Sequence, residues 1–222
     1  MTGLVRMATL FTAAGVLMAS IAVASVPTCG NCTAPSLIPL VTRDALNDPD
    51  LIDFGTQSPT LTISVRDLGN NPLNNASVVI DLGNVTDLQL CADQQDLDAL
   101  VNCTAKTIRK FTDVTGIVHF TVLGGGKGAV PATGLAGGRI YVNGILISSP
   151  TVATCDLNGI NGIDAFDKAI LLSDINAFPG QARGRSDENG DNAVNAFDVA
   201  VWLTHFNAPT HVASCGSLGT CP

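Results

Sequence analysis

The chain has 222 residues, a length that allows one large domain or two small ones. Hydrophobic residues make up 46% and charged residues only 14%, while glycine is abundant and aromatic residues are scarce, a balance typical of β-rich exported proteins with many turns. The formal net charge of −8 argues against a nucleic-acid partner, which needs a basic surface, and it suits cation binding.

Residues 1–24 are predicted to be a signal peptide. They contain one arginine and a long apolar run, and they end in Ala22-Val23-Ala24, a small-x-small cleavage signature. A retained transmembrane anchor is the alternative, because the run approaches the roughly 18 residues that a membrane span requires. The rest of the sequence has no second apolar run, so we expect a mature chain without membrane insertion, either secreted or held at the cell surface.

Residues 34–150, which follow a short tail over residues 25–33, are predicted to form an antiparallel β-sandwich. Apolar side chains recur at every second position between clusters of turn-forming residues, as half-buried strands require. The core-facing sets are Leu61, Ile63 and Val65, then Val78, Ile80 and Leu82, then Val118, Phe120 and Val122. Residues 36–41 add a strand, and Asn143-Gly144 between two β-branched runs predicts a two-residue hairpin turn.

The order of these pieces resembles bacterial immunoglobulin-like domains. The residues that carry the resemblance are Arg66-Asp67, Pro72-Leu73, Ala76 and Val78, followed by Thr112-Asp113, Gly116 and Phe120. The resemblance implies an immunoglobulin-like sandwich that serves as a spacer or adhesive module. The glycine-rich stretch from Gly124 to Gly138 is expected to be a flexible loop, since it lacks the Gly-Lys-Ser/Thr ending of a phosphate-binding loop.

All seven cysteines follow the predicted cleavage point, which in an exported protein indicates disulfides. Cys91 and Cys103 bracket a short polar loop, and we expect them to pair. Cys155 is expected to pair with Cys215, with Cys221 in the tail over residues 211–222 as the competing partner. For Cys29 and Cys32 we expect a structural role rather than redox or zinc chemistry. Seven is an odd number, so one thiol is free or intermolecular.

Residues 156–177 and 187–208 are two copies of one segment, with 11 of 22 aligned positions identical. Each copy begins with a loop that fits the twelve-residue calcium-loop pattern, in which oxygen ligands occupy positions 1, 3, 5, 7, 9 and 12. In loop two (residues 187–198) these ligands are Asp187, Asn189, Asp191, the carbonyl of Ala193, Asn195 and Asp198. Position 6, ideally glycine, is Asn192, which tolerates a left-handed backbone. Position 8 is the apolar Val194.

Loop one (residues 156–167) has an incomplete set of oxygen ligands. Its candidate ligands are Asp156, Asn158, the carbonyl of Gly162, Asp164 and Asp167. Ile160 occupies position 5 and has no side-chain oxygen. We therefore expect one calcium site in loop two and a weak or absent site in loop one.

A helix is predicted after each loop. Phe166, Ala169, Ile170 and Ser173 recur at helical spacing in the first copy, as do Phe197, Ala200, Val201 and Thr204 in the second. Neither half can bury its apolar face alone, so we expect the two faces to pack against each other.

The two loop–helix units, with aspartate at position 12 in place of the EF-hand glutamate, resemble the dockerin family over about residues 155–208, within a module assigned to residues 151–210. The resemblance implies a Ca²⁺-dependent module that docks onto a cohesin-like protein receptor. The receptor-contacting pair is commonly polar in that family. Here it is Ala165-Phe166 and Ala196-Phe197, a departure from the usual recognition pair.

The sequence contains no recognisable catalytic constellation around its three histidines, its serines or its cysteines. We therefore expect a non-enzymatic, exported protein that is mainly β with a small α part. In it, an immunoglobulin-like sandwich precedes a dockerin-like calcium module that mediates protein attachment or assembly at the cell surface.

Three alternatives remain at this stage. The aspartates and asparagines of the repeats could serve only as turns and helix caps. The chain could be an extracellular ligand-binding or adhesion protein with purely structural calcium, whose binding edge is formed by residues 124–138 and the loop between Cys91 and Cys103. A carbohydrate-binding module is less favoured, because Trp202 and Tyr141 are the only Trp and Tyr residues.

Overall fold

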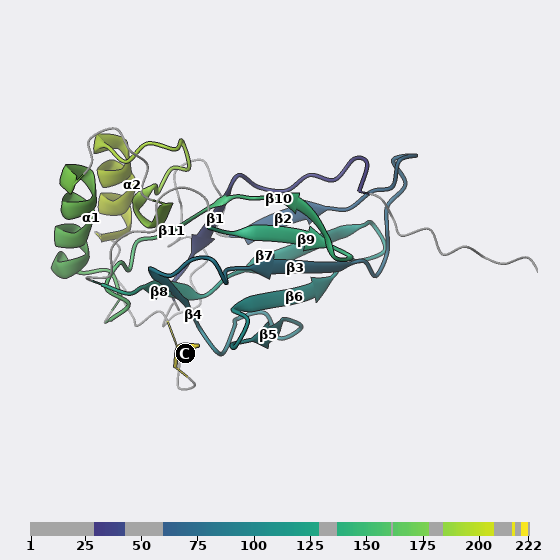
Figure 1. Ribbon diagram of the computed structural model, residues 1–222, viewed down its shortest axis with the longest axis horizontal. Coiled ribbons are helices and arrows are strands. Elements are labelled where there is room, and N and C mark those ends of the chain that lie inside the picture. Colours follow the sequence, from purple (N-terminus) through teal and green to yellow (C-terminus); the bar gives the residue numbers. More distant parts are fainter. Residues whose placement is uncertain are drawn as a thin grey trace, which may run out of the picture.

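The computed structural model describes residues 29–42, 60–128, 137–160, 162–177, 184–206, 215 and 219–221. Within these ranges the chain is mainly β-sheet with two short helices, which confirms the predicted class. The helices lie together at one end of an elongated body of strands (Figure 1). No helix in this part of the chain is long and apolar enough to cross a membrane. The predicted signal peptide lies outside the described residues.

The secondary-structure elements of these ranges follow in chain order. The strands are β1 (Leu37–Leu40), β2 (Thr60–Ser64), β3 (Ser77–Asp81), β4 (Leu88–Leu90), β5 (Leu100–Asn102), β6 (Thr107–Phe111), β7 (Ile117–Thr121), β8 (Gly124–Gly126), β9 (Arg139–Val142), β10 (Ile145–Ser148) and β11 (Thr151–Thr154). The helices are α1 (Ala165–Ala177), the short 3-10 helix η2 (Gly184–Ser186) and α2 (Ala196–Phe206).

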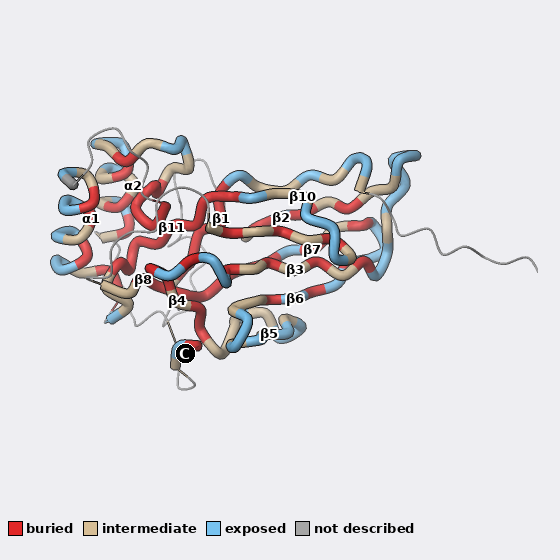
Figure 2. Tube along the Cα trace, viewed as in Figure 1, coloured by how far each residue is buried: buried red, intermediate tan, exposed pale blue. Residues whose placement is uncertain are grey.

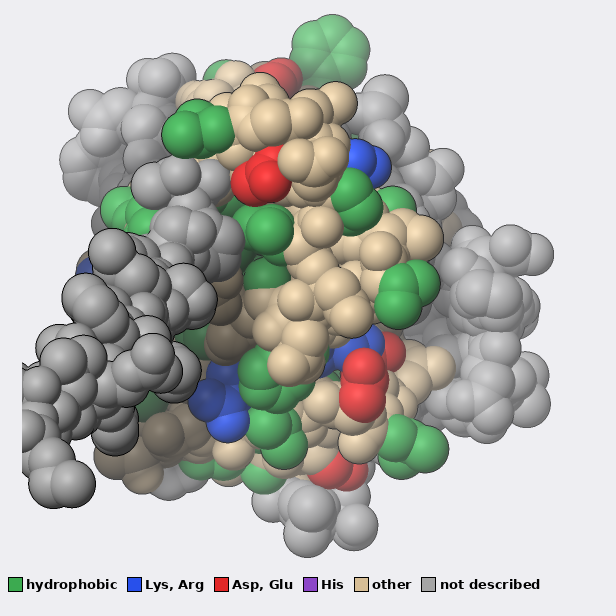
Figure 3. All heavy atoms as spheres, turned by 90° about the vertical axis from the view of Figure 1, so that its right-hand side faces the viewer, with side chains coloured by type: hydrophobic (Ala, Val, Ile, Leu, Met, Phe, Trp, Pro, Cys, Tyr) green, Lys and Arg blue, Asp and Glu red, His purple; other side chains and the backbone are tan. Residues whose placement is uncertain are grey.

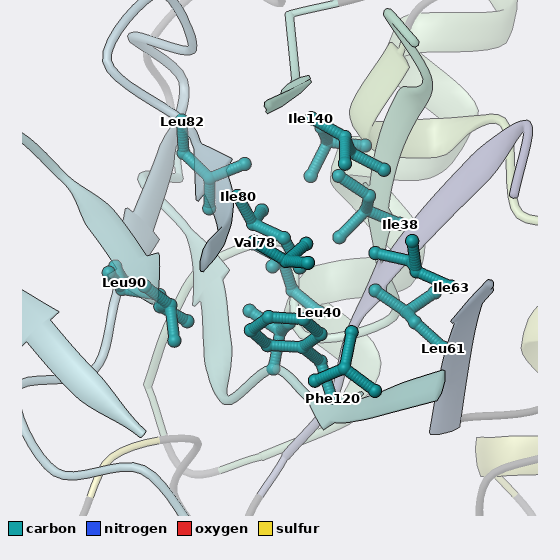
Figure 4. Close-up of a cluster of buried hydrophobic side chains, with 14 of the residues drawn as sticks. Ile38, Leu40, Leu61, Ile63, Val78, Ile80, Leu82, Leu90, Phe120 and Ile140 are labelled. Carbon is teal, nitrogen blue, oxygen red and sulfur yellow. The ribbon is translucent and has the colours of Figure 1, made fainter. Parts of the chain in front are cut away.

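The largest sheet has five antiparallel strands in the order β10-β9-β3-β6-β5, and β2 pairs with β7 in a second antiparallel sheet. Buried residues alternate with half-buried ones along β3 and with half-buried or exposed ones along β6, so each strand turns one face inward (Figure 2). All nine side chains predicted to face the core are buried. Figure 4 shows side chains from both sheets meeting there, among them Phe120, Ile80 and Ile63.

The predicted hairpin turn joins β9 to β10. Asn143 and Gly144 both have positive φ, 50° and 84°, as a two-residue turn of this kind requires. The Asn143 side chain also accepts a hydrogen bond from the backbone N–H of Ser77 at 2.9 Å, which ties the turn to the start of β3. This prediction is confirmed.

The β-sheet body (the strands β2 to β10) and the helical end (loop one, α1, η2, loop two and α2) are joined by a parallel pair of strands, β1 and β11. β1 lies beside β11 with Leu37 opposite Thr151, and all eight residues of the two strands are buried. β11 leads directly into loop one. The helical end therefore follows directly from a buried strand, without an intervening linker.

The glycine stretch begins with a buried strand, so the expectation of a flexible loop is wrong for residues 124–126. β8 pairs with β4, and its three glycines are buried. The Gly126 N–H donates to the Asp156 carbonyl at 2.6 Å, and the Gly128 N–H donates to the Leu157 carbonyl at 3.0 Å. A Cβ atom at Gly126 would overlap the Leu157 carbonyl, so only glycine lets loop one approach so closely. Residues 129–136 lie outside the described part of the chain.

A buried ion pair within the helical end is also bonded to the chain two residues after β8. The Arg185 guanidinium donates to both carboxylate oxygens of Asp174 on α1, at 2.8 and 3.0 Å, and also to the Gly128 carbonyl at 3.1 Å. The Ser186 hydroxyl donates to the same carboxylate at 2.7 Å. Because Arg185 and Asp174 are almost wholly buried, removing one partner would leave an uncompensated charge in the interior.

The predicted pairings of the later cysteines are wrong. Cys91 is bonded to Cys215 and Cys103 to Cys221, while Cys155 is a buried free thiol. The reason is the path of the C-terminal segment, which returns beside β4: the Cys221 N–H donates to the Leu90 carbonyl at 2.7 Å. Cys29 and Cys32 form a third disulfide. Three disulfides favour an oxidising extracellular environment.

The helices follow the two loops as predicted, but the predicted packing faces are wrong. Phe166, Ala169 and Ser173 of α1 are exposed, and the buried positions of that helix are Asp167, Leu171 and Asp174. The corresponding row of α2 is Asp198, Trp202 and His205. Each helix therefore buries the row that begins with the last residue of its loop. The Trp202 Nε1–H donates to the Cys155 carbonyl at 3.0 Å, which fixes α2 against the end of β11.

We predict that Gly126→Ala lowers the free energy of unfolding by about 1–3 kcal/mol, the usual cost of overpacking, because the new Cβ atom must displace the backbone of loop one. Urea unfolding measures the change. Gly69→Ala is the matched control, since its nearest neighbours are the side chains of Asn71 and Asp67 in an exposed turn, and a change below about 0.5 kcal/mol is expected there. Equal effects of the two substitutions would contradict the tight contact at β8.

Candidate metal centre

The last residue of each loop organises that loop in the same way. The Asp167 carboxylate accepts the backbone N–H groups of Asn158 and Asp164, at 2.7 and 2.6 Å. The Asp198 carboxylate accepts those of Asn189 and Asn195, at 3.3 and 2.8 Å. In both loops position 12 therefore binds the amides of positions 3 and 9. Isolated turns and helix caps would not require position 12 to bind positions 3 and 9 in both copies. The two repeats therefore share one local structure.

Positions 3 and 9 are equivalent in the two loops as well. The Asn158 side-chain oxygen accepts the Ile160 N–H at 2.6 Å, and that of Asn189 accepts the Asp191 N–H at 2.9 Å. At position 9, Asp164 and Asn195 each accept the N–H two residues later, at 2.8 Å in both loops, at the start of the helix that follows. These bonds are local side-chain caps, which the residue types favour.

Loop two has further internal bonds at position 1. The Asp187 carboxylate accepts the N–H groups of Asp191 and Asn192, at 3.1 and 3.0 Å. Asn192 has φ of 67°, so the sharp turn at position 6 forms without glycine, as predicted. Val194 at position 8 is buried, as is Ile163 in loop one, so each loop is anchored to the interior by an apolar side chain.

The carboxylates at positions 1 and 12 are fully buried: Asp156, Asp167, Asp187 and Asp198 have no exposed surface. Burial, reinforced by the like charges of Asp156 and Asp164, raises the pKa of Asp167 to about 7. Burial, reinforced by Asp198 and Asp191, raises the pKa of Asp187 to about 6. The pKa of Asp198 is raised for the same reason. Negative charge is therefore crowded in both loops, and a cation placed among these groups would relieve the repulsion.

A buried glutamate beside this cluster was not recognised in the sequence. Glu188 at position 2 of loop two is fully buried, where the equivalent residue of loop one is the core residue Leu157. The Cys155 thiol donates to its Oε2 atom at 3.5 Å, and its Oε1 atom has no hydrogen-bond partner among the described residues. Burial raises the pKa of both groups well above their ordinary values. The only available signal was the exchange of leucine for glutamate between the repeats.

The donor set of loop two has the chemistry that Ca²⁺ prefers, because every side-chain donor is a hard oxygen. Within the described ranges, no three acidic, histidine or cysteine side chains already converge on a common metal position. Asp187 and Asp198 each accept two backbone amides, and an ionised carboxylate has about four lone-pair sites. Both groups therefore retain acceptor capacity for a cation, and the residues fit a hard divalent ion.

Loop one differs from loop two in what supports it. Ile160 at position 5 points to solvent and is 60% exposed, so it supplies no side-chain oxygen. The Asp156 carbonyl accepts a hydrogen bond from Gly126 of β8, and the Leu157 carbonyl accepts one from Gly128, two residues after that strand. Loop one is thus held in place by backbone hydrogen bonds from β8 and the residues that follow it. The residue at position 6, Asn161, lies outside the described part of the chain.

The two described histidines, His119 and His205, lie in different parts of the fold. His119 is exposed on β7, where its Nδ1 atom lies 3.0 Å from the Thr62 hydroxyl, as a surface strand residue. His205 is buried on α2, and His211 lies outside the described residues.

Comparison with known proteins finds no matching family model, no match among curated proteins and no match among solved structures.

We predict that the protein in chelator loses stability as the pH rises from about 4 to about 7. The folded pKa values of Asp167 and Asp187, about 7 and about 6, lie above the ordinary 3.8, so the folded state binds more protons than the unfolded state in this window. Urea unfolding along the pH series measures the slope. The double variant Asp167→Asn/Asp187→Asn should flatten it. Stability that rises with pH in chelator would contradict the crowding of buried carboxylates.

Proposed function

We propose that this chain is an exported, non-enzymatic protein in which a dockerin-like, calcium-ordered module lies on an immunoglobulin-like sandwich and mediates attachment to a partner protein at the cell surface. The observation that carries the proposal is the shared hydrogen-bond scheme of the two loops around buried, mutually repelling carboxylates. A divalent cation is the simplest counter-charge for such a cluster.

Loop two is the proposed calcium site. The residues that would hold the ion are Asp187, Asn189, Asp191, the Ala193 carbonyl, Asn195 and Asp198. Bound Ca²⁺ would supply positive charge to the crowded carboxylates and so favour their ionised forms. Because Asp198 is also the first buried residue of α2, ion binding and the docking of that helix are coupled.

The proposed attachment surface is the exposed start of the two helices. Phe166 and Phe197 are 73% and 71% exposed, and each directly precedes the position-12 residue of its loop. Leu172 and Ile160 are further exposed apolar residues of the first repeat. At the end of the body remote from the helices, by contrast, hydrophobic side chains are scattered among polar ones (Figure 3). Each phenylalanine is the second residue of the pair that in dockerins is commonly polar, with a hydroxyl, so we propose a partner that presents an apolar surface.

The alternative in which the sheet-body loops bind the ligand has less support. Residues 124–126, part of its proposed binding edge, are buried beneath loop one. The loop after Cys91 is fixed to β6, because Lys110 of that strand pairs with Asp96 and Asp98 at 3.1 and 2.9 Å. We therefore place attachment on the helical end.

The test is capture of a protein from the exported fraction of the producing organism by the immobilised full exported chain. We predict that a partner is retained in calcium, released by chelator and lost with the double variant Phe166→Ser/Phe197→Ser. The matched control is Leu68→Ser/Val114→Ser, which removes two side chains of similar exposure, 74% and 75%, from turns of the sheet body. Capture that ignores calcium, or that is lost equally with the control pair, would contradict the proposal.

A further inference from the structure

The outward face of the five-stranded sheet carries a continuous row of apolar and cationic side chains. Strand register places Leu100 opposite Arg109, Arg109 opposite Val79, Val79 opposite Tyr141, and Tyr141 opposite Leu146. The neighbours of Arg109, Val79 and Tyr141 along their strands are buried, so these three side chains share the opposite face, and the register extends the row to Leu100 and Leu146 at its two ends. Leu100 and Leu146 are each 49% exposed, and no described element covers the row.

Aromatic rings on this face are paired with guanidinium groups. Arg109 lies over the ring of Phe111, 5.5 Å from its centroid, and Phe111 is 44% exposed two residues further along β6. Arg139 lies over the ring of Tyr141, 5.9 Å from its centroid. Each pair presents a flat apolar surface beside a planar cation.

Charged side chains also stand on this face. Arg109 and Arg139 lie on it by strand register, together with Asp81, which is opposite Arg139. Lys106 directly precedes β6, and its pKa is lowered by burial and then by its hydrogen bond to Lys127 and the repulsion between the two. Arg139 is paired with Asp81 at 2.9 Å, whereas Arg109 is exposed and makes no ion pair within the described residues. Asp81 offsets the charge of Arg139, and Lys106 lies near Asp87, so the charge that complements a negatively charged ligand is chiefly that of Arg109.

We propose that this face binds an acidic polysaccharide whose sugar rings carry carboxylates. Aromatic rings pack against the apolar faces of sugar rings, and a guanidinium group matches a carboxylate in a bidentate geometry. The open sheet presents both kinds of group along one row, which suits an extended chain of repeating units. A second copy of this protein is disfavoured, because stacking two such faces would bring like charges together.

This surface is separate from the phenylalanines of the helical end and from both calcium loops. Leu100, at one end of the row, lies in the stretch between Cys91 and Cys103, so the row borders one of the sheet-body loops considered above. Its occupation therefore does not depend on calcium, and the surface adds a glycan contact to the proposed protein attachment.

The test measures the affinity of the full exported chain for polygalacturonate by calorimetry in low salt. Dextran serves as the neutral polymer and polyglutamate as an acidic polymer without sugar rings. Chelator is present throughout, so that calcium cannot bridge two acidic molecules. We expect binding to polygalacturonate and none to dextran. Arg109→Gln should lower the affinity about ten-fold, the effect of losing one charge-assisted hydrogen bond, and Phe111→Ala should also lower it.

The matched control is Lys168→Gln, which removes the same unit charge from an exposed position on α1, and it should leave the affinity unchanged. The proposal is overturned by an absence of polygalacturonate binding, by affinity that survives both Arg109→Gln and Phe111→Ala, or by an equal loss in Lys168→Gln. Polyglutamate binding as tight as that of polygalacturonate, with no effect of Phe111→Ala, would assign the face to acidic peptides and overturn the saccharide.

Discussion

The hydrogen bonds from β8 to the backbone of loop one join the two parts of this molecule. They require the chain to approach Gly126 so closely that no side chain fits between them. The parallel pair β1–β11 and the buried Arg185–Asp174 ion pair also stabilise this junction. The helical end is therefore built onto the sheets, and its two loops stand in different surroundings.

In our proposal, the different surroundings of the two loops account for the difference between their ligand sets. Loop one has lost an oxygen ligand at Ile160 but has gained the edge of β8 as a support. Within the described residues, loop two makes no backbone hydrogen bond to a strand, although Gly190 lies against Leu37 and Glu188 is bonded to the Cys155 thiol. Its backbone is ordered chiefly by the bonds that Asp187 and Asp198 accept. In our proposal the complete ligand set is kept where an ion is needed to hold the loop. The sheet takes the place of the ion in the other copy.

Features that depend on a few neighbouring residues could be predicted from the sequence. The alternating strands, the Asn143-Gly144 turn and the two loop–helix units are local patterns, and all are found. The cysteine pairing could not be predicted, because it depends on where the C-terminal segment returns in space. The burial of β8 also leaves no periodic signal, since three glycines are buried only by what packs over them. The helix faces were misassigned for a related reason: the buried row begins with Asp167 and Asp198, which are polar by sequence.

Glu188 can lie inside the module because burial, reinforced by the neighbouring buried carboxylates, raises its pKa well above its ordinary value. The raised pKa favours the neutral form, and burying that form costs less than burying a charge. Loop two thus combines a buried acid of raised pKa with acids whose ionised forms a cation would favour. Its stability should respond to the ion more strongly than that of loop one.

The most direct measurement is a calorimetric calcium titration of the mature protein and of two matched variants, Asp187→Asn and Asp156→Asn. Each removes one buried position-1 charge and keeps the side-chain volume. The account predicts one tight site, retained in Asp156→Asn and lost in Asp187→Asn, with a lower melting temperature in chelator for the unaltered protein. Absence of calcium binding, or a site lost in Asp156→Asn and kept in Asp187→Asn, would contradict it.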